Sequence, residues 1–213
     1  GTSQRVLRDY AQALGDFLPA LPAQPSGQCV QVALFSRYPL LGLQQPDGKP
    51  AAQGALRGED QVSFANGSRL SVQGDGDLFL LNEGGGLRLV ARLDREEYVA
   101  RVLQREAAAQ PAEAARALAV AIRTYLQQNA TRQGECLGID DSSSQQRVAP
   151  RPASNEARAV ASWTRDLVLA GSAVTYHADV QAVDKLGWQQ AVEQAGAGLR
   201  YDQILARAYP RAS

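Results

Sequence analysis

At 213 residues the chain is long enough to bury a sizeable hydrophobic core, and its length suits one domain or two. Its 22 basic residues balance its 22 acidic residues, which excludes a bulk field that would attract nucleic acid or an anionic membrane surface. No apolar run reaches the roughly 18 residues of a membrane-spanning helix, so we expect no membrane span.

Residues 1–27 predict an N-terminal lead and a proline-rich strap. An amphipathic stretch over residues 3–18 is followed by Pro19, Pro22 and Pro25, which are typical of a linker. The chain begins with Gly1-Thr2 rather than a methionine, so we expect that a signal peptide has been removed and that the protein is periplasmic or secreted.

Residues 28–93 predict antiparallel β hairpins. Asn66-Gly67, between two alternating segments, is the strongest hairpin signal in the chain. Residues 37–60 are rich in Gly, Pro and Gln and predict a loop. Further strands are expected at Cys29–Phe35, Leu78–Leu81 and Leu87–Leu93.

Residues 94–125 predict two consecutive helices. Asp94 can cap the first helix, and Glu97 three residues later would complete a capping box. Val99, Val102 and Leu103 form its apolar stripe at helical spacing.

Glu106 follows Leu103 by three residues and Val102 by four, so it belongs to the apolar side of the first helix, where an ionised carboxylate is costly unless paired. One interpretation is a structural glutamate bonded to backbone or to an arginine. The other is a carboxyl group beside a groove that donates a proton near neutral pH.

The remaining chain predicts mainly helices. Residues 131–153 are polar and predict a long loop, and Leu167–Tyr176 predicts a hairpin. Helices are expected after a cap at Ser154 or Asn155, at Trp188–Gln194 and at Tyr201–Ala208. Because strands come first and helices later, we expect an α+β fold: one domain over 28–213, with a β part at 28–93 and a helical part at 94–213.

Cys29 and Cys136 are the only cysteines and His177 is the only histidine, so a four-ligand zinc site cannot be completed from these residues, and we expect no metal and no cofactor. Two free buried thiols and a disulfide between the β region and the long loop are both open, and an exported protein favours the bridge.

Two segments carry a family resemblance. The run EEYVARVLQRE, followed by PAEAARALAVAIRTY, resembles the signature of the stage II sporulation protein D family (SpoIID), which includes the amidase enhancers (LytB). AVASWTRDLVLAGSAVTYHAD and LRYDQILARAYP are similar to later segments of the same family. Glu106 falls on the family's catalytic glutamate, although one residue fewer separates it from Pro111.

The chain also departs from the family pattern. His177 is followed by Ala178 rather than a Ser/Gly-rich run, and the segments at 141–148 and 185–190 lack the family's histidines and cysteine. The chain most resembles a divergent branch of secreted proteobacterial proteins, often encoded beside bacterial alpha-2-macroglobulins.

The resemblance implies a lytic transglycosylase that cleaves peptidoglycan glycan strands with Glu106 as the single general acid/base. Ser143, Gln146, Tyr176 and His177 are the polar residues that we would place near it as substrate binders. The alternative is a non-catalytic envelope module that binds glycan or a protein partner, for which a bacterial alpha-2-macroglobulin complex is a candidate.

Overall fold

The computed structural model describes residues 25–140, 146–171, 174–177 and 185–210; for 175–177 only the backbone is described. Within these ranges, one sheet holds seven strands in the order β2-β3-β4-β5-β1-β7-β6. All neighbours are antiparallel except β1 and β7, which run parallel. The strands are β1 (Cys29–Leu34), β2 (Leu40–Gln44), β3 (Gly54–Phe64), β4 (Arg69–Glu83), β5 (Gly86–Asp94), β6 (Thr131–Gln133) and β7 (Cys136–Asp140).

The second half of the chain supplies the helices and a small parallel pair of strands. These elements are α2 (Arg95–Glu106), α3 (Ala112–Asn129), α4 (Asn155–Trp163), β8 (Thr175–His177), β9 (Lys185–Gly187), α5 (Trp188–Gly196) and α6 (Tyr201–Ala208). The fold is therefore α+β, as the order of predicted elements indicated.

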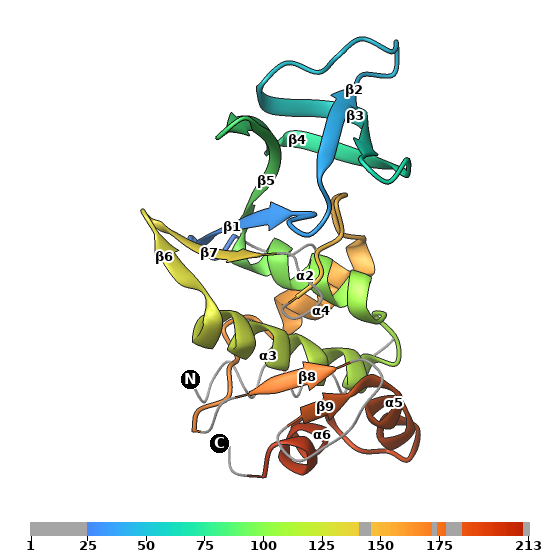
Figure 1. Cartoon of the computed structure of the whole chain (residues 1–213). Helices are drawn as coiled ribbons and strands as arrows, with labels where there is room; N and C mark the ends of the chain where they lie inside the picture. The colour runs from blue at the N-terminus through green and yellow to red at the C-terminus, as the bar shows by residue number, and fades with distance from the viewer. Residues whose placement is uncertain (1–24, 141–145, 172–173, 178–184, 211–213) are drawn as a thin grey trace.

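Figure 1 shows three tiers, with the β2–β5 hairpins at one end, α2, α3 and α4 in the middle, and the β8–β9 pair with α5 and α6 at the other end. Helix α3 contacts α2 and α4 on one side and β8, α5 and α6 on the other. Most of α3 is accordingly buried, because it is covered from both sides. It is the central support of the helical part.

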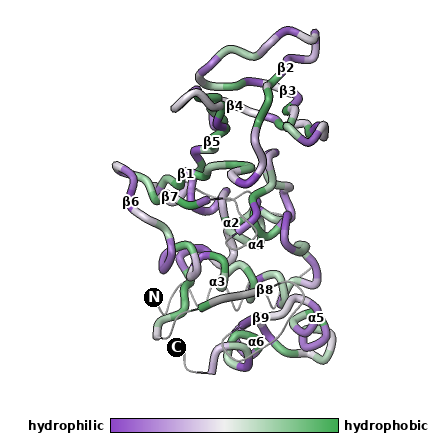
Figure 2. Tube along the Cα trace, in the orientation of Figure 1, coloured by the Kyte–Doolittle hydropathy of each residue, from purple (hydrophilic) through white to green (hydrophobic). Residues whose placement is uncertain are grey.

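Hydrophobic and hydrophilic residues alternate in short stretches along the chain, as Figure 2 shows. Of the helices that the structure describes, none is both long enough and apolar enough to cross a membrane. Apolar side chains instead form one core that runs from the sheet through α2 and α3 to α6.

Several local predictions are confirmed. Phe64 and Ser68 close the hairpin about Asn66-Gly67, with the Phe64 N–H donating to the Ser68 carbonyl at 3.0 Å. Ser154 caps α4 by accepting a hydrogen bond from the Ala157 N–H. Helix α6 has the predicted bounds.

Three loop and hairpin predictions are wrong. The predicted loop at 37–60 contains β2 and the start of β3, and the predicted loop at 131–153 contains β6 and β7. The predicted hairpin at Leu167–Tyr176 is absent from its described residues, where 167–171 form no strand and β8 pairs in parallel with β9. Strands β2, β6 and β7 have only five, three and five residues, so local alternation carries little signal for them.

The two cysteines form a disulfide between the adjacent strands β1 and β7, with the Cα atoms of Cys29 and Cys136 4.7 Å apart. The predicted bridge is thus confirmed, although Cys136 begins a strand rather than lying in a loop. The bond fastens the parallel β1–β7 pair and spans 107 residues of sequence.

Candidate active site

Helix α2 positions the candidate site. Its N-cap is Asp94, whose side chain accepts from the Glu96 N–H at 3.0 Å. The predicted stripe of Val99, Val102 and Leu103 is fully buried. In a capping box the Glu97 side chain would also accept a hydrogen bond from the Asp94 backbone N–H. The Glu97 carboxylate instead binds other groups.

Those partners are arginines and a backbone amide. Glu97 accepts from Arg101 at 3.0 Å, from Arg158 at 2.8 Å and from the Ala153 N–H at 2.9 Å. Burial by itself raises the pKa of Glu97, but the bonds from Arg158, Ala153 and Arg101 outweigh it and leave that pKa below its ordinary value. Glu97 therefore ties α2 to α4 and to the residues that precede α4.

A buried ion pair joins α2 to α3. Glu96 and Arg123 are almost completely buried, and the guanidinium grips both carboxylate oxygens, at 2.6 and 3.1 Å. Arg123 also donates to the carbonyl of Leu167 at 2.9 Å and to Thr164 Oγ1 at 3.2 Å. Arg95 donates to Glu96 Oε1 at 2.9 Å, so each end of the pair has more than one partner, which a buried charge requires.

Glu106 is the last residue of α2 and is half-buried. Its Oε1 accepts a hydrogen bond from the Arg147 N–H at 3.1 Å. Among the described residues nothing donates to Oε2, so one carboxylate oxygen is held by a hydrogen bond and the other is not. Two pockets, of about 550 and 300 Å³, lie elsewhere and neither is lined by Glu106, so a groove beside it stays a prediction.

Gln146 is fully buried next to this contact. The hydroxyl of Tyr98 donates to its Oε1, and its Nε2 donates to the Ile122 carbonyl at 3.2 Å. The amide fastens the segment carrying Arg147 to α2 and α3, a structural function that the sequence did not indicate. Direct contact of this amide with a substrate stays a prediction.

The described residues do not test the other predicted substrate binders. Ser143 lies outside the described ranges. Tyr176 and His177 belong to β8, of which the backbone is described, and β8 contacts α3 on the side that carries α5 and α6. Their proposed roles stay predictions.

Sequence reasoning missed the two buried charge clusters around Glu96 and Glu97. Glu97 was predicted only as part of a capping box, and acidic residues in the first turn of a helix are otherwise usually explained by the helix dipole. The available signal was Arg123, a charge that directly follows the apolar run ALAVAI within the predicted helix. Nowhere in the described ranges do three or more His, Cys, Asp or Glu side chains gather where they could hold a metal ion.

The motif segments, now placed on α2, α3 and the strands after them, match a known family. Residues 83–194, more than half of the chain, match the stage II sporulation protein (SpoIID) family, and the chain belongs to it. Residues 184–213, which include β9, α5 and α6, match a family described as a predicted secreted protein (DUF2300). Membership supports a role related to peptidoglycan, and the second match supports secretion.

One relative is the uncharacterized protein YfaQ of Escherichia coli (strain K12), which is 51% identical over 211 residues. That alignment covers 99% of this chain but 38% of YfaQ, so the chain spans well under half the length of this relative. No solved structure matches the chain.

Proposed function

We propose that the protein is a lytic transglycosylase that cleaves the glycan strands of peptidoglycan, with Glu106 as its general acid/base. The observation that carries the proposal is the placement of Glu106. It ends the buried face of α2, in the segment that matches the family, with one oxygen held by the Arg147 N–H at 3.1 Å and the other free among the described residues.

One carboxyl group is sufficient for this reaction. The acid protonates the glycosidic oxygen as the bond between that oxygen and C1 breaks. The carboxylate then accepts the proton of the sugar's own 6-hydroxyl as that oxygen bonds to C1, which gives a 1,6-anhydro product without consuming water. Ordinary glycosidases need a second carboxylate for a nucleophile or for activating water.

The contacts around Glu106 suit a positioned acid. The Arg147 N–H belongs to a segment fixed by the buried Gln146, and α2 is itself fixed by the Glu96–Arg123 pair. A catalytic group held by packed elements keeps its orientation toward a bound sugar, which general acid–base catalysis requires.

The decisive experiment is digestion of purified sacculi followed by chromatography and mass spectrometry of the released muropeptides. We expect products ending in 1,6-anhydro sugars. Stripping the stem peptides first tests whether naked glycan is the better substrate. If neither substrate yields anhydro products, the enzyme proposal is rejected.

A second candidate is an envelope module that binds glycan or a protein partner without catalysis. One observation favours this module: the Gln146 amide is hydrogen-bonded to Tyr98 and Ile122 inside the core, so these bonds already use the side chain that was predicted to bind substrate. A sacculus pull-down in which the protein is retained, together with a digest free of anhydro products, would support this module.

A further inference from the structure

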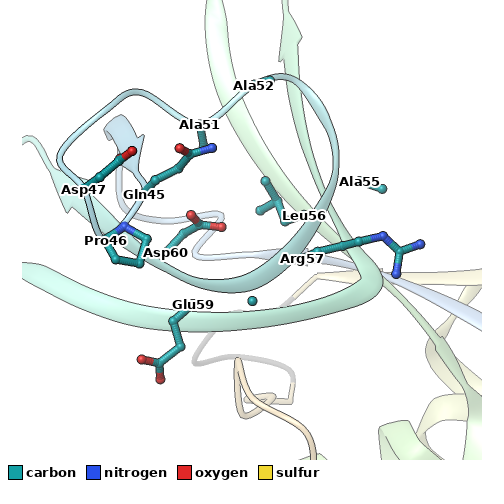
Figure 3. A pocket seen from close by; sticks show the side chains of 11 residues that line it. Gln45, Pro46, Asp47, Ala51, Ala52, Ala55, Leu56, Arg57, Glu59 and Asp60 are labelled. Atoms are coloured by element: carbon teal, nitrogen blue, oxygen red, sulfur yellow. The ribbon is translucent and has the colours of Figure 1, made fainter.

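A pocket of about 550 Å³ lies at the far end of the sheet from the helices, between the β2–β3 connection and strand β3. Figure 3 shows the connection arching over this space. Backbone hydrogen bonds hold the arch in shape, with Ala51 donating to the Leu43 carbonyl and Gln45 donating to the Lys49 carbonyl, both at 2.8 Å. The volume is within the range of small-molecule sites.

The floor of this pocket carries a buried carboxylate. Asp60 is only 7% exposed and lies on the same face of β3 as the core residues Val62 and Phe64, where an apolar residue is expected. No hydrogen bond or ion pair joins its carboxyl group to any other described residue. Burial raises the pKa of Asp60, which reflects the cost of a desolvated carboxylate without a partner.

The side chain is aimed at the space under the arch. In Figure 3 the Asp60 carboxyl group points toward the interior, where the Gln45 amide also lies, whereas Glu59 points away. The Asp60 carboxyl group has no hydrogen-bond or ion-pair partner among the described residues and lines the pocket, so a ligand in this space could bond to it.

Charge in and around the pocket favours a cationic ligand. Asp47 and Asp60 line it, Glu59 also lines it but is paired with Arg151 at 2.5 Å, and Arg57 is the basic lining residue. The Arg57 guanidinium points out of the pocket in Figure 3 and lies 4.0 Å from Asp75. It is therefore not the counter-ion of Asp60.

The pocket also has an apolar wall. Pro46, Ala51, Ala52 and Leu56 line it beside the carboxylate. Such a wall suits the methylene groups of a flexible side chain, whose charged end would then reach the carboxylate at the floor. A small, strongly hydrated ion would leave this wall unused.

We propose that this pocket binds a primary ammonium group carried on an aliphatic stem, such as a lysine side chain, with Asp60 as its charge partner. The site is separate from Glu106 and goes beyond the cleavage of glycan proposed above. Its chemistry is that of a lysine-bearing peptide or another aliphatic amine. It does not depend on whether the protein is an enzyme.

The test is calorimetric titration of the whole protein with Nα-acetyl-lysine methylamide, with Nα-acetyl-norleucine methylamide as the probe that keeps the stem and loses the ammonium group. We expect the lysine probe to bind and the norleucine probe to bind at least about tenfold more weakly. The arginine analogue should also bind more weakly than the lysine probe. Equal affinity for lysine and norleucine, or tighter binding of arginine, would overturn the proposal.

Asp60→Asn is the matched variant, and Asp140→Asn, an exposed position on β7, is its control with the same change in charge. Asp60→Asn should lose binding of the lysine probe at least about tenfold, whereas Asp140→Asn should retain it. Because Asp60→Asn removes an unpaired buried charge, it should also melt at a higher temperature than the wild type, and the probe should raise the melting temperatures of the wild type and of Asp140→Asn but not that of Asp60→Asn. Unchanged probe affinity in Asp60→Asn would contradict the assignment.

Discussion

The Arg147 N–H donates to Glu106 Oε1 at 3.1 Å, and this bond joins the end of α2 to a segment 41 residues further along the chain. The residue before Arg147 is Gln146, whose amide is anchored in the core by Tyr98 and Ile122. Tyr98 lies on the same helix as Glu106. The Glu106 carboxylate is therefore oriented by a closed set of contacts, which runs from Tyr98 on α2 through Gln146 and Arg147 back to Glu106 on the same helix.

Tyr98→Phe tests this set of contacts. It removes the hydroxyl that donates to Gln146 and leaves a buried amide oxygen without a donor, so we expect the free energy of unfolding to fall by about 1–3 kcal/mol. Urea unfolding followed by circular dichroism measures it. Anhydro-muropeptide release should also fall at temperatures where the variant is fully folded, through kcat more than KM, because Glu106 is less well oriented. A stability equal to that of the wild type would show that the Tyr98–Gln146 bond contributes little.

The Glu96–Arg123 pair should dominate the stability of the helical part. Glu96→Gln leaves the Arg123 guanidinium buried with its charge uncompensated, and we expect a loss of about 3–5 kcal/mol. Arg88→Gln, which breaks the exposed pair with Glu83, should cost less than about 1 kcal/mol in the same urea experiment. Similar losses in the two variants would contradict the importance given to burial.

The sequence predicted those parts of the fold whose signals are local. The turn at Asn66-Gly67, the cap at Ser154 and the bounds of α6 depend on residues within a few positions of one another. Strand β7 was missed because its place is set by parallel pairing with β1, more than a hundred residues earlier. No local pattern reports such a partner.

In the candidate site, too, the sequence predicted the features that depend on local signals and missed those that depend on distant partners. Helical spacing placed Glu106 at the end of the apolar face of α2, and it is half-buried there. Polarity made Gln146 resemble a surface binder, but two bonds satisfy its amide inside the core. Whether a polar residue is buried depends on partners supplied by distant elements, here Tyr98 and Ile122, and that information is absent from its own segment.

The disulfide should contribute strongly to stability, because it closes a loop of 107 residues. The chain-entropy model gives about 4–5 kcal/mol for a loop of this length. Replacing both cysteines, as Cys29→Ser with Cys136→Ser, should lower the free energy of unfolding by up to that amount in urea. Treatment with a reductant should shift the wild type toward the double variant and leave the variant unchanged. A reductant effect of equal size on both would show that it does not act through this bond.

Acid should destabilise the protein in part through Glu97. Its pKa is lowered in the folded state, so its contribution is fully present above the unfolded value of about 4.3 and is lost as the pH falls through the lower folded value. Glu97→Gln should therefore reduce the unfolding free energy at pH 7, and the wild type and variant should converge as the pH is lowered below about 4. Asp60, whose pKa is raised, acts with the opposite sign: Asp60→Asn should gain stability relative to the wild type as the pH rises above about 4. Urea unfolding at a series of pH values measures both differences.

The catalytic prediction is that Glu106→Gln abolishes release of anhydro-muropeptides from sacculi while the protein stays folded. The amide preserves the size of the side chain, and its oxygen can still accept the Arg147 N–H, but it cannot donate and retrieve the proton that the reaction needs. The rate should fall at least about 100-fold. Glu156→Gln, at an exposed position in the first turn of α4, makes the same chemical change away from the site and should keep full activity. His177→Ala should lower the rate less than Glu106→Gln, since we assign it to orienting the substrate. If Glu106→Gln releases anhydro products as fast as the wild type, the proton is carried by another group and the family's catalytic assignment does not apply to this chain.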